Sequence, residues 1–188
     1  MIITCIGNCQ TLSLSFYLQQ LLGPDNISWI VYGDEFIRHL GRWSNKCQNK
    51  IIDYDESIEQ IKISDIIIFQ NIDSEKSKFC NKKKLSEIKK QGCILIQIPS
   101  IYILVHQFDT SINELIKREE KNDVDIKVSD ILIKYKRSIK RLVIDEHHPK
   151  TFLFLEVLKR ITDMIGIDFF TKKQYIDFMK NDNYMELP

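Results

Sequence analysis

The sequence predicts a three-layer α/β/α sandwich with a mainly parallel sheet and a helical C-terminal part. Short apolar runs rich in β-branched residues alternate with longer amphipathic segments, a pattern typical of parallel sheets covered by helices. Asp65–Phe69 (DIIIF) is the strongest strand signal, because its consecutive apolar residues suit a central strand buried on both faces. No internal repeat, low-complexity segment or Gly-, Ser- or Pro-rich linker interrupts the chain, so we expect one domain over residues 1–188.

The first third of the chain alternates strand and helix. Met1–Ile6 is predicted as the first strand. Thr11–Leu22 carries its leucines at helical spacing, and Gly23-Pro24 after it is a typical helix stop. Ile27–Tyr32 is predicted as the second strand, whereas Phe36–Lys50 is weakly patterned and fits a short helix and a loop.

The alternation continues after the central strand. The predicted elements are, in chain order, a Lys-rich helix at Asn81–Gln91, a strand at Cys93–Ile98, helices at Ser111–Lys121 and Val124–Lys140, a short strand at Leu142–Ile144 and a helix at Pro149–Ile165. The last helix has a stripe of large apolar residues and is followed by Gly166, a typical residue after a helix end.

Composition excludes several classes of protein. The 27 Lys and Arg residues nearly balance the 26 Asp and Glu residues, so no general attraction to nucleic acid or to an anionic membrane is expected. No apolar run approaches the roughly 20 residues needed to cross a bilayer, and Met1–Leu22 lacks the basic start and cleavage site of a secretory signal. No C-x-x-C spacing occurs among the five cysteines, which are Cys5, Cys9, Cys47, Cys80 and Cys93. We therefore expect a cytoplasmic protein without a metal site.

The turn after the first predicted strand is the first candidate site, because ligands of parallel sheets gather at the carboxyl ends of strands. Gly7 permits a tight turn or the close approach of a ligand. Cys9 then lies near a helix N-terminus, where the helix dipole favours a thiolate and free N–H groups can bind an oxyanion. The alternative is that Cys9 is a small buried residue and Asn8 a turn former.

The second candidate site directly precedes the last predicted helix. Pro149 fits the first helical position, which makes His148 the N-cap. The helix dipole there disfavours an imidazolium, so His148 is able to act as a base, with Asp145 orienting its ring. The alternative is a polar loop. Metal binding by His147 and His148 is disfavoured, because adjacent residues rarely chelate one ion.

Two further strand ends carry polar residues. Gln70 and Asn71 follow the central strand, and their amides suit hydrogen bonds to an oxyanion or a sugar hydroxyl, or a structural turn. Tyr102 and His106 follow the next strand and either line a pocket or belong to the core or its rim. Taken together, the strand ends offer a thiol, a base with its orienting carboxylate, and amide donors, which is the composition of a Cys-His-Asp site for acyl chemistry.

This order of residues resembles a known superfamily. A nucleophile after the first strand, an Asn-bearing turn after a central strand and a late Asp-x-x-His motif are similar to the SGNH hydrolases, with Cys9 in place of their serine. The segments IGNCQ, IIIFQN, IPSIY and RLVIDEHHP resemble more closely the WcbI family of capsular-polysaccharide acetyltransferases, which bind coenzyme A. The resemblance covers about Ile2 to Gly166 and implies a single SGNH-like acyltransferase domain of flavodoxin-like architecture over residues 1–188. It also implies that Cys9 and His148 are the catalytic pair.

By this resemblance the chain transfers an acetyl group from acetyl-coenzyme A to a hydroxyl, or an amine, of a sugar, nucleotide sugar or glycan in surface polysaccharide biosynthesis. Either Cys9 accepts the acetyl group as a thioester, or His148 activates the acceptor directly. The oxyanion donors are then the backbone N–H of Cys9 or Gln10 and the side chain of Asn71. Coenzyme A carries phosphates, and the basic residues expected to bind them are Lys134, Lys136, Arg137, Lys140 and Arg141. The alternative is that these residues form a solvated helix face.

Two other functions stay open from the sequence. An esterase or deacylase of the same architecture uses water in place of the sugar, although cysteine as the nucleophile favours transfer. A non-catalytic module that binds a glycan or a nucleotide is the third alternative, with no nucleic acid as partner in any of the three.

Overall fold

The structure is a computed structural model that describes residues 1–31, 50–51, 54–71, 81–137, 142–143 and 149–180. The chain forms two units, Met1–Ile98 and Pro99–Pro188. The expectation of a single acyltransferase domain over residues 1–188 stays a prediction. Within the described residues, no helix is both long enough and apolar enough to pass through a membrane.

A five-stranded sheet forms the centre of the first unit, in the order β3-β2-β1-β4-β5. All neighbouring strands are parallel, as the sequence predicted. The strands are β1 (Ile3–Gly7), β2 (Ile27–Val31), β3 (Lys50–Ile51), β4 (Ile66–Gln70) and β5 (Ile94–Ile98). From β1 the chain adds β2 and β3 on one side and then β4 and β5 on the other. The strand order therefore reverses between β1 and β4.

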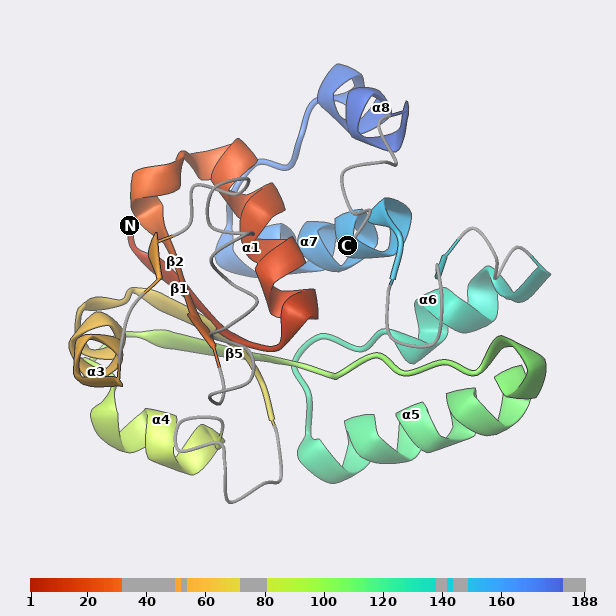
Figure 1. Cartoon of the computed structure of the whole chain (residues 1–188), viewed down its shortest axis with the longest axis horizontal. Coiled ribbons are helices and arrows are strands. Elements are labelled where there is room, and N and C mark those ends of the chain that lie inside the picture. Colours follow the sequence, from red (N-terminus) through yellow and green to blue (C-terminus); the bar gives the residue numbers. More distant parts are fainter. Residues whose placement is uncertain (32–49, 52–53, 72–80, 138–141, 144–148, 181–188) are drawn as a thin grey trace. The chain divides into compact units, whose positions relative to one another are not determined.

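Helices cover both faces of this sheet, which gives the predicted three layers (Figure 1). They are α1 (Cys9–Leu22), the 3-10 turn η1 (Pro24–Asn26), α3 (Tyr54–Ile63) and α4 (Lys82–Ile88). The connection through α1 leads to one side of β1, and the connections through α3 and α4 lead to the other side. Right-handed crossovers therefore place α1 on one face and α3 with α4 on the opposite face. The core under α3 and α4 contains Ile6, Ile30, Ile61, Ile67, Phe69, Leu85 and Cys93.

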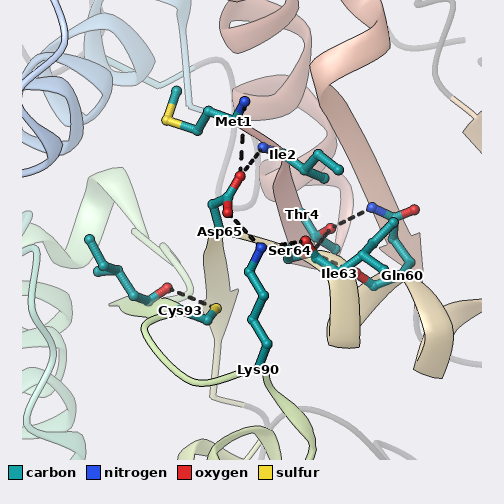
Figure 2. A network of polar contacts seen from close by, with 10 residues as sticks. Met1, Ile2, Thr4, Gln60, Ile63, Ser64, Asp65, Lys90 and Cys93 are labelled. Carbon is teal, nitrogen blue, oxygen red and sulfur yellow. Dashed lines mark hydrogen bonds and ion pairs between the residues drawn. The ribbon is translucent and has the colours of Figure 1, made fainter.

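Polar contacts hold the amino edge of the sheet, where β1 and β4 begin (Figure 2). The carboxylate of Asp65 accepts hydrogen bonds from the Ile2 N–H at 2.7 Å and from Lys90 Nζ at 2.6 Å. Lys90 Nζ also donates to the carbonyl of Ile63 at 2.9 Å. The hydrogen bond from Lys90 is the main reason that the pKa of Asp65 is lowered, with a second contribution from the Ile2 N–H. Parallel sheets bind their ligands at the opposite, carboxyl edge, which is therefore the candidate site.

The second unit is helical, as predicted for the C-terminal part. Its elements are the 3-10 turn η2 (Val105–Gln107), α5 (Phe108–Asn122), α6 (Ser129–Lys134), α7 (Thr151–Ile165) and α8 (Lys172–Lys180). The strand predicted at Leu142–Ile144 is wrong as an element, because the described part of it forms only an isolated antiparallel bridge between Val143 and Pro149. Ile144 lies outside the described residues.

The helix predicted at Val124–Lys140 is only partly confirmed, because α6 covers Ser129–Lys134 and residues 124–128 before it are not helical. Asp123 ends α5 in the left-handed conformation (φ 47°), so the chain turns instead of continuing as a helix. Lys140 lies outside the described residues. Other boundaries differ by a few residues: α5 begins at Phe108 and not at Ser111, and α4 ends at Ile88 and not at Gln91. The short helix and loop predicted at Phe36–Lys50 lie outside the described residues, except for Lys50, which begins β3.

Glu119 of α5 fixes the point at which α6 begins. Its side chain is buried, and one carboxylate oxygen accepts hydrogen bonds from the N–H groups of Val128, at 2.7 Å, and Ser129, at 3.0 Å. The other oxygen accepts a hydrogen bond from the Ser129 hydroxyl. A carboxylate from one helix thus satisfies the backbone donors at the N-terminus of the next, where the helix dipole also favours a negative charge.

We predict that Glu119→Ala lowers the free energy of unfolding by about 3 kcal/mol, because it leaves two backbone N–H groups and a hydroxyl without their buried acceptor. Urea unfolding followed by circular dichroism measures this change. The matched control is Glu120→Ala, which removes an exposed carboxylate from the same helix and should change the stability by less than about 0.5 kcal/mol. Equal losses in the two variants would contradict a capping role for Glu119.

Candidate functional site

The turn between β1 and α1 is held by Asn8, the N-cap of the helix. Asn8 Oδ1 accepts a hydrogen bond from the Gln10 N–H at 2.9 Å. The carbonyl of Asn8 accepts hydrogen bonds from the Thr11 N–H at 3.1 Å and from the Thr11 hydroxyl at 2.7 Å. Because this capping starts the helix two residues earlier than predicted, α1 begins at Cys9 and not at Thr11. Cys9 is therefore the first helical residue, and it is half-buried.

Gln70, the last residue of β4, joins this turn to the neighbouring strand. Its side chain is fully buried. Gln70 Oε1 accepts a hydrogen bond from the Asn8 N–H at 3.1 Å, and Gln70 Nε2 donates to Gln10 Oε1 at 3.1 Å. The carboxyl ends of β1 and β4 thus meet around one amide, at the place where strand order reverses and α/β sheets bind their ligands.

Gly7 is required here by packing. A Cβ atom at this position would lie 2.6 Å from Gln70 Oε1 and 2.6 Å from Thr11 Cγ2, and closer still to Thr11 Oγ1. The Thr11 hydroxyl has a fixed position, because it donates to the Asn8 carbonyl and accepts a hydrogen bond at 3.2 Å from Trp29 Nε1 of β2. The close approach for which the sequence suggested a glycine is thus an approach by the protein's own side chains.

Thr11 and Trp29 complete the site and were not among the residues expected from the sequence. For Thr11 a local signal existed, since Thr hydroxyls can bond the backbone carbonyl three or four residues before them. Trp29 lies 18 positions from its partner Thr11 and carries no local signal. Gln10 was expected to offer its N–H to an oxyanion, but in this structure that N–H donates to Asn8 Oδ1.

Three of the five cysteines lie in the described residues, and Cys9 is the most exposed of them. Cys5 is fully buried in β1, and desolvation raises the pKa of its thiol far above the ordinary value. Burial also raises the pKa of the Cys93 thiol. Since the thiolate is the reactive form, neither buried thiol suits nucleophilic chemistry. Cys47 and Cys80 lie outside the described residues.

The other expected site residues are only partly described. Asn71 follows β4 and is half-buried. Tyr102, half-buried, and His106, exposed in η2, belong to the second unit. Asp145 and His148 lie outside the described residues, so the pairing of His148 with Cys9 stays a prediction.

The expectation that His148 is the N-cap of the last helix is wrong. α7 begins at Thr151, and its N-cap is Lys150. Pro149 forms the bridge with Val143, and the Lys150 N–H donates to the Leu142 carbonyl at 2.7 Å. This pairing holds residues 149 and 150 in an extended conformation and delays the start of the helix.

A basic segment follows α6 in the second unit. Lys134, Lys136 and Arg137 are exposed. An open hollow of about 460 Å³ is lined by Ile133, Lys134, Tyr135, Lys136 and Arg137. Lys136 Nζ forms an ion pair with Asp109 Oδ1 at 2.6 Å and lies 5.6 Å from the centre of the Phe108 ring. Lys140 and Arg141 lie outside the described residues. Among the residues that the structure describes, no cluster of three or more His, Cys, Asp or Glu side chains is arranged to hold a metal ion.

Comparison with known proteins yields one solved structure of similar fold. The chain is similar in fold to WcbI. That protein is described as a novel polysaccharide biosynthesis enzyme, and its structure is of the native protein without a disulfide bond between coenzyme A and one of its cysteines. The TM-score is 0.64 at 15% identity, over 92% of this chain and 71% of that one. No family model matches the chain, and no curated protein matches it. At this identity the likeness establishes the fold alone.

We predict that Gly7→Ala lowers the free energy of unfolding by about 3 kcal/mol, because the new methyl group overlaps with the side chains of Gln70 and Thr11. Thermal or urea unfolding measures the loss. Gly92→Ala is the matched control: its φ of 82° is unfavourable for alanine, but nothing lies within 4 Å of the added carbon, so about 1 kcal/mol is expected. A loss at Gly7 no greater than at Gly92 would show that the close packing around Gly7 is not required.

Proposed function

We propose that this chain is a coenzyme A-dependent acyltransferase that moves an acetyl group to a hydroxyl, or an amine, of a sugar in polysaccharide biosynthesis. Cys9 is the nucleophile, His148 the base and Asp145 the residue that orients it. The observation that carries this proposal is the position of Cys9, the first residue of α1, at the carboxyl ends of β1 and β4.

The position of Cys9 favours nucleophilic chemistry for two physical reasons. The N-terminus of a helix stabilises a negative charge, so a thiol there is more readily ionised than a thiol in the core. Cys9 is also the described cysteine that solvent and substrate can reach best. Both reasons concern the thiol itself and hold for any acyl donor.

The fold likeness supports the choice of acyl donor and pathway. WcbI is described as a polysaccharide biosynthesis enzyme, and its description mentions coenzyme A and a cysteine. We propose that Cys9 acts on the thioester of acetyl-coenzyme A as substrate. The Cys9 thiolate attacks the thioester carbonyl, and the thiolate of coenzyme A leaves. Since one thioester replaces another, this exchange has little thermodynamic cost. The sugar hydroxyl oxygen then attacks the acetylated cysteine while His148 takes the hydroxyl proton, and the Cys9 thiolate leaves.

The basic segment after α6 supports binding of the phosphates of that substrate. We propose that Lys136 and Arg137 contact these phosphates, together with Lys134 beside the same hollow and with Lys140 and Arg141 further along the chain. Arginine and lysine side chains are the usual partners of phosphate groups in proteins. The ion pair of Lys136 with Asp109 competes with this role, which offers a direct test.

The acyl-transfer proposal is tested by following thiol release from acetyl-coenzyme A with and without candidate sugars. We expect release that depends on the sugar, an acetylated Cys9 peptide in the mass spectrum, and a loss of at least about a thousandfold in kcat for Cys9→Ala. Cys93→Ala, which alters a buried thiol on the same sheet, is the control and should retain activity.

Other outcomes would identify the alternative functions. Thiol release at the same rate without any sugar would indicate a hydrolase. If acetyl transfer occurs but no acetylated Cys9 forms and Cys9→Ala retains its rate, His148 activates the acceptor directly. An absence of turnover, together with normal ligand binding by Cys9→Ala and His148→Ala, would indicate a binding module.

We predict that Asp109→Asn tightens the binding of coenzyme A by up to about fivefold, because it frees Lys136 from an exposed ion pair worth at most about 1 kcal/mol. Lys136→Ala should weaken binding by a similar factor. Calorimetric titration measures both. Asp163→Asn, which removes an exposed carboxylate from α7, is the control for net charge. Equal dissociation constants for Asp109→Asn and this control would contradict a role of Lys136 in phosphate binding.

A further inference from the structure

The Gln70 amide forms a closed ring of three hydrogen bonds with the turn that carries Cys9. The Asn8 N–H donates to Gln70 Oε1 at 3.1 Å, Gln70 Nε2 donates to Gln10 Oε1 at 3.1 Å, and the Gln10 N–H donates to Asn8 Oδ1 at 2.9 Å. Cys9 lies in the chain between Asn8 and Gln10, the two residues that Gln70 binds. The ring therefore fixes the backbone on both sides of the thiol.

The ring uses both polar atoms of the Gln70 amide. Gln70 accepts one hydrogen bond through its oxygen and donates another through its nitrogen, and glutamine does both without a charge, whereas glutamate does both only when it is protonated. The side chain is fully buried, so water is not present to replace either partner. The fit around Gly7, where a Cβ atom would lie 2.6 Å from Gln70 Oε1, holds this oxygen in place.

We infer that Gln70 is a positioning residue for Cys9, and this inference rests on the proposed function of Cys9 as the nucleophile. Gln70 holds the first turn of α1 against the end of β4, so that the thiol stays at the helix N-terminus and in one orientation. One of the roles that the sequence left open has the Gln70 amide donate to the substrate oxyanion, which would use the second N–H of Nε2, since the first donates to Gln10 Oε1. The two roles predict opposite results for one substitution.

The experiment compares Gln70→Met, which removes both hydrogen-bonding groups at similar volume, with Gln70→Glu, which keeps the shape and two acceptor oxygens. In a positioning role, Gln70→Met lowers kcat for acetyl transfer by about a hundredfold, with the KM for acetyl-coenzyme A changed less than about threefold. The new carboxylate in Gln70→Glu still accepts a hydrogen bond from the Asn8 N–H. It also accepts one from Gln10 Nε2 once the side-chain amide of Gln10 has flipped, so that its nitrogen and oxygen exchange places. Gln70→Glu therefore regains at least about tenfold of the lost kcat. If Gln70 donates to the oxyanion, Gln70→Glu has the lower kcat of the two, because it removes the donor and adds a repelling charge.

A second measurement does not depend on acetyl transfer. The rate of Cys9 alkylation by iodoacetamide, read by peptide mapping, is taken at neutral pH and divided by the rate at the alkaline plateau. This ratio cancels changes in accessibility and reports how readily the thiol ionises. We expect Cys9 of the parent protein to react faster at neutral pH than Cys5 and Cys93, and Gln70→Met to lower the ratio by about tenfold.

Gln97→Met is the control, because Gln97 is also a buried glutamine of the sheet but does not belong to the ring. It lies in β5 and pairs with Phe69, the residue of β4 that precedes Gln70. An unchanged ratio in Gln70→Met and Gln97→Met alike would overturn the positioning role, even if the parent protein transfers acetyl groups. A lowered ratio confined to Gln70→Met would support positioning even if no transfer is found, in which case the proposed function fails by itself. Should Gln70→Met not fold, Gln10→Met breaks one bond of the same ring and is expected to lower the ratio in the same direction; no change there would count against the inference.

Discussion

The geometry of the candidate site depends on one buried amide. Gln70 binds the residues on either side of Cys9, and the absence of a side chain at Gly7 leaves the room that the Gln70 oxygen occupies. Buried polar groups need partners, since an unpaired one costs about 1–3 kcal/mol. Moving the turn between β1 and α1 away from β4 would therefore leave the buried Gln70 amide without these hydrogen bonds.

The two edges of the sheet are stabilised by different kinds of contact. At the amino edge, Asp65 and Lys90 form an ion pair that is 41% and 40% exposed, so water screens much of its energy. At the carboxyl edge, the contacts around Gln70 join neutral amides, of which Gln70 and Gln10 are buried and Asn8 is half-buried. Neutral partners fix the turn without placing a full charge beside Cys9. The N-terminus of α1, at which Cys9 lies, favours the anionic form of a thiol.

The fold by itself does not determine the reaction. Three-layer α/β folds support many activities, and the similarity to WcbI at 15% identity extends to architecture alone. The proposed acyl chemistry depends on one residue type at one position, a thiol at the start of a helix where strand order reverses. The proposed phosphate-bearing substrate depends on separate residues, Lys136 and Arg137, and on the hollow beside them in the other unit.

The sequence alone determined those features that leave a local pattern. The central strand was predicted at Asp65–Phe69 and lies at Ile66–Gln70, because a strand buried on both faces shows as an unbroken apolar run. The turn containing Gly7 and Cys9 was also found from the sequence, since it lies between a strand pattern and a helix pattern. Tertiary structure decided the rest. Glu119 placed the start of α6, and the pairing of Pro149 with Val143 moved the start of α7. The Gln70 amide joins residues about 60 positions apart, and a hydrogen bond over that separation leaves no trace in the local sequence, because only folding brings its two partners together.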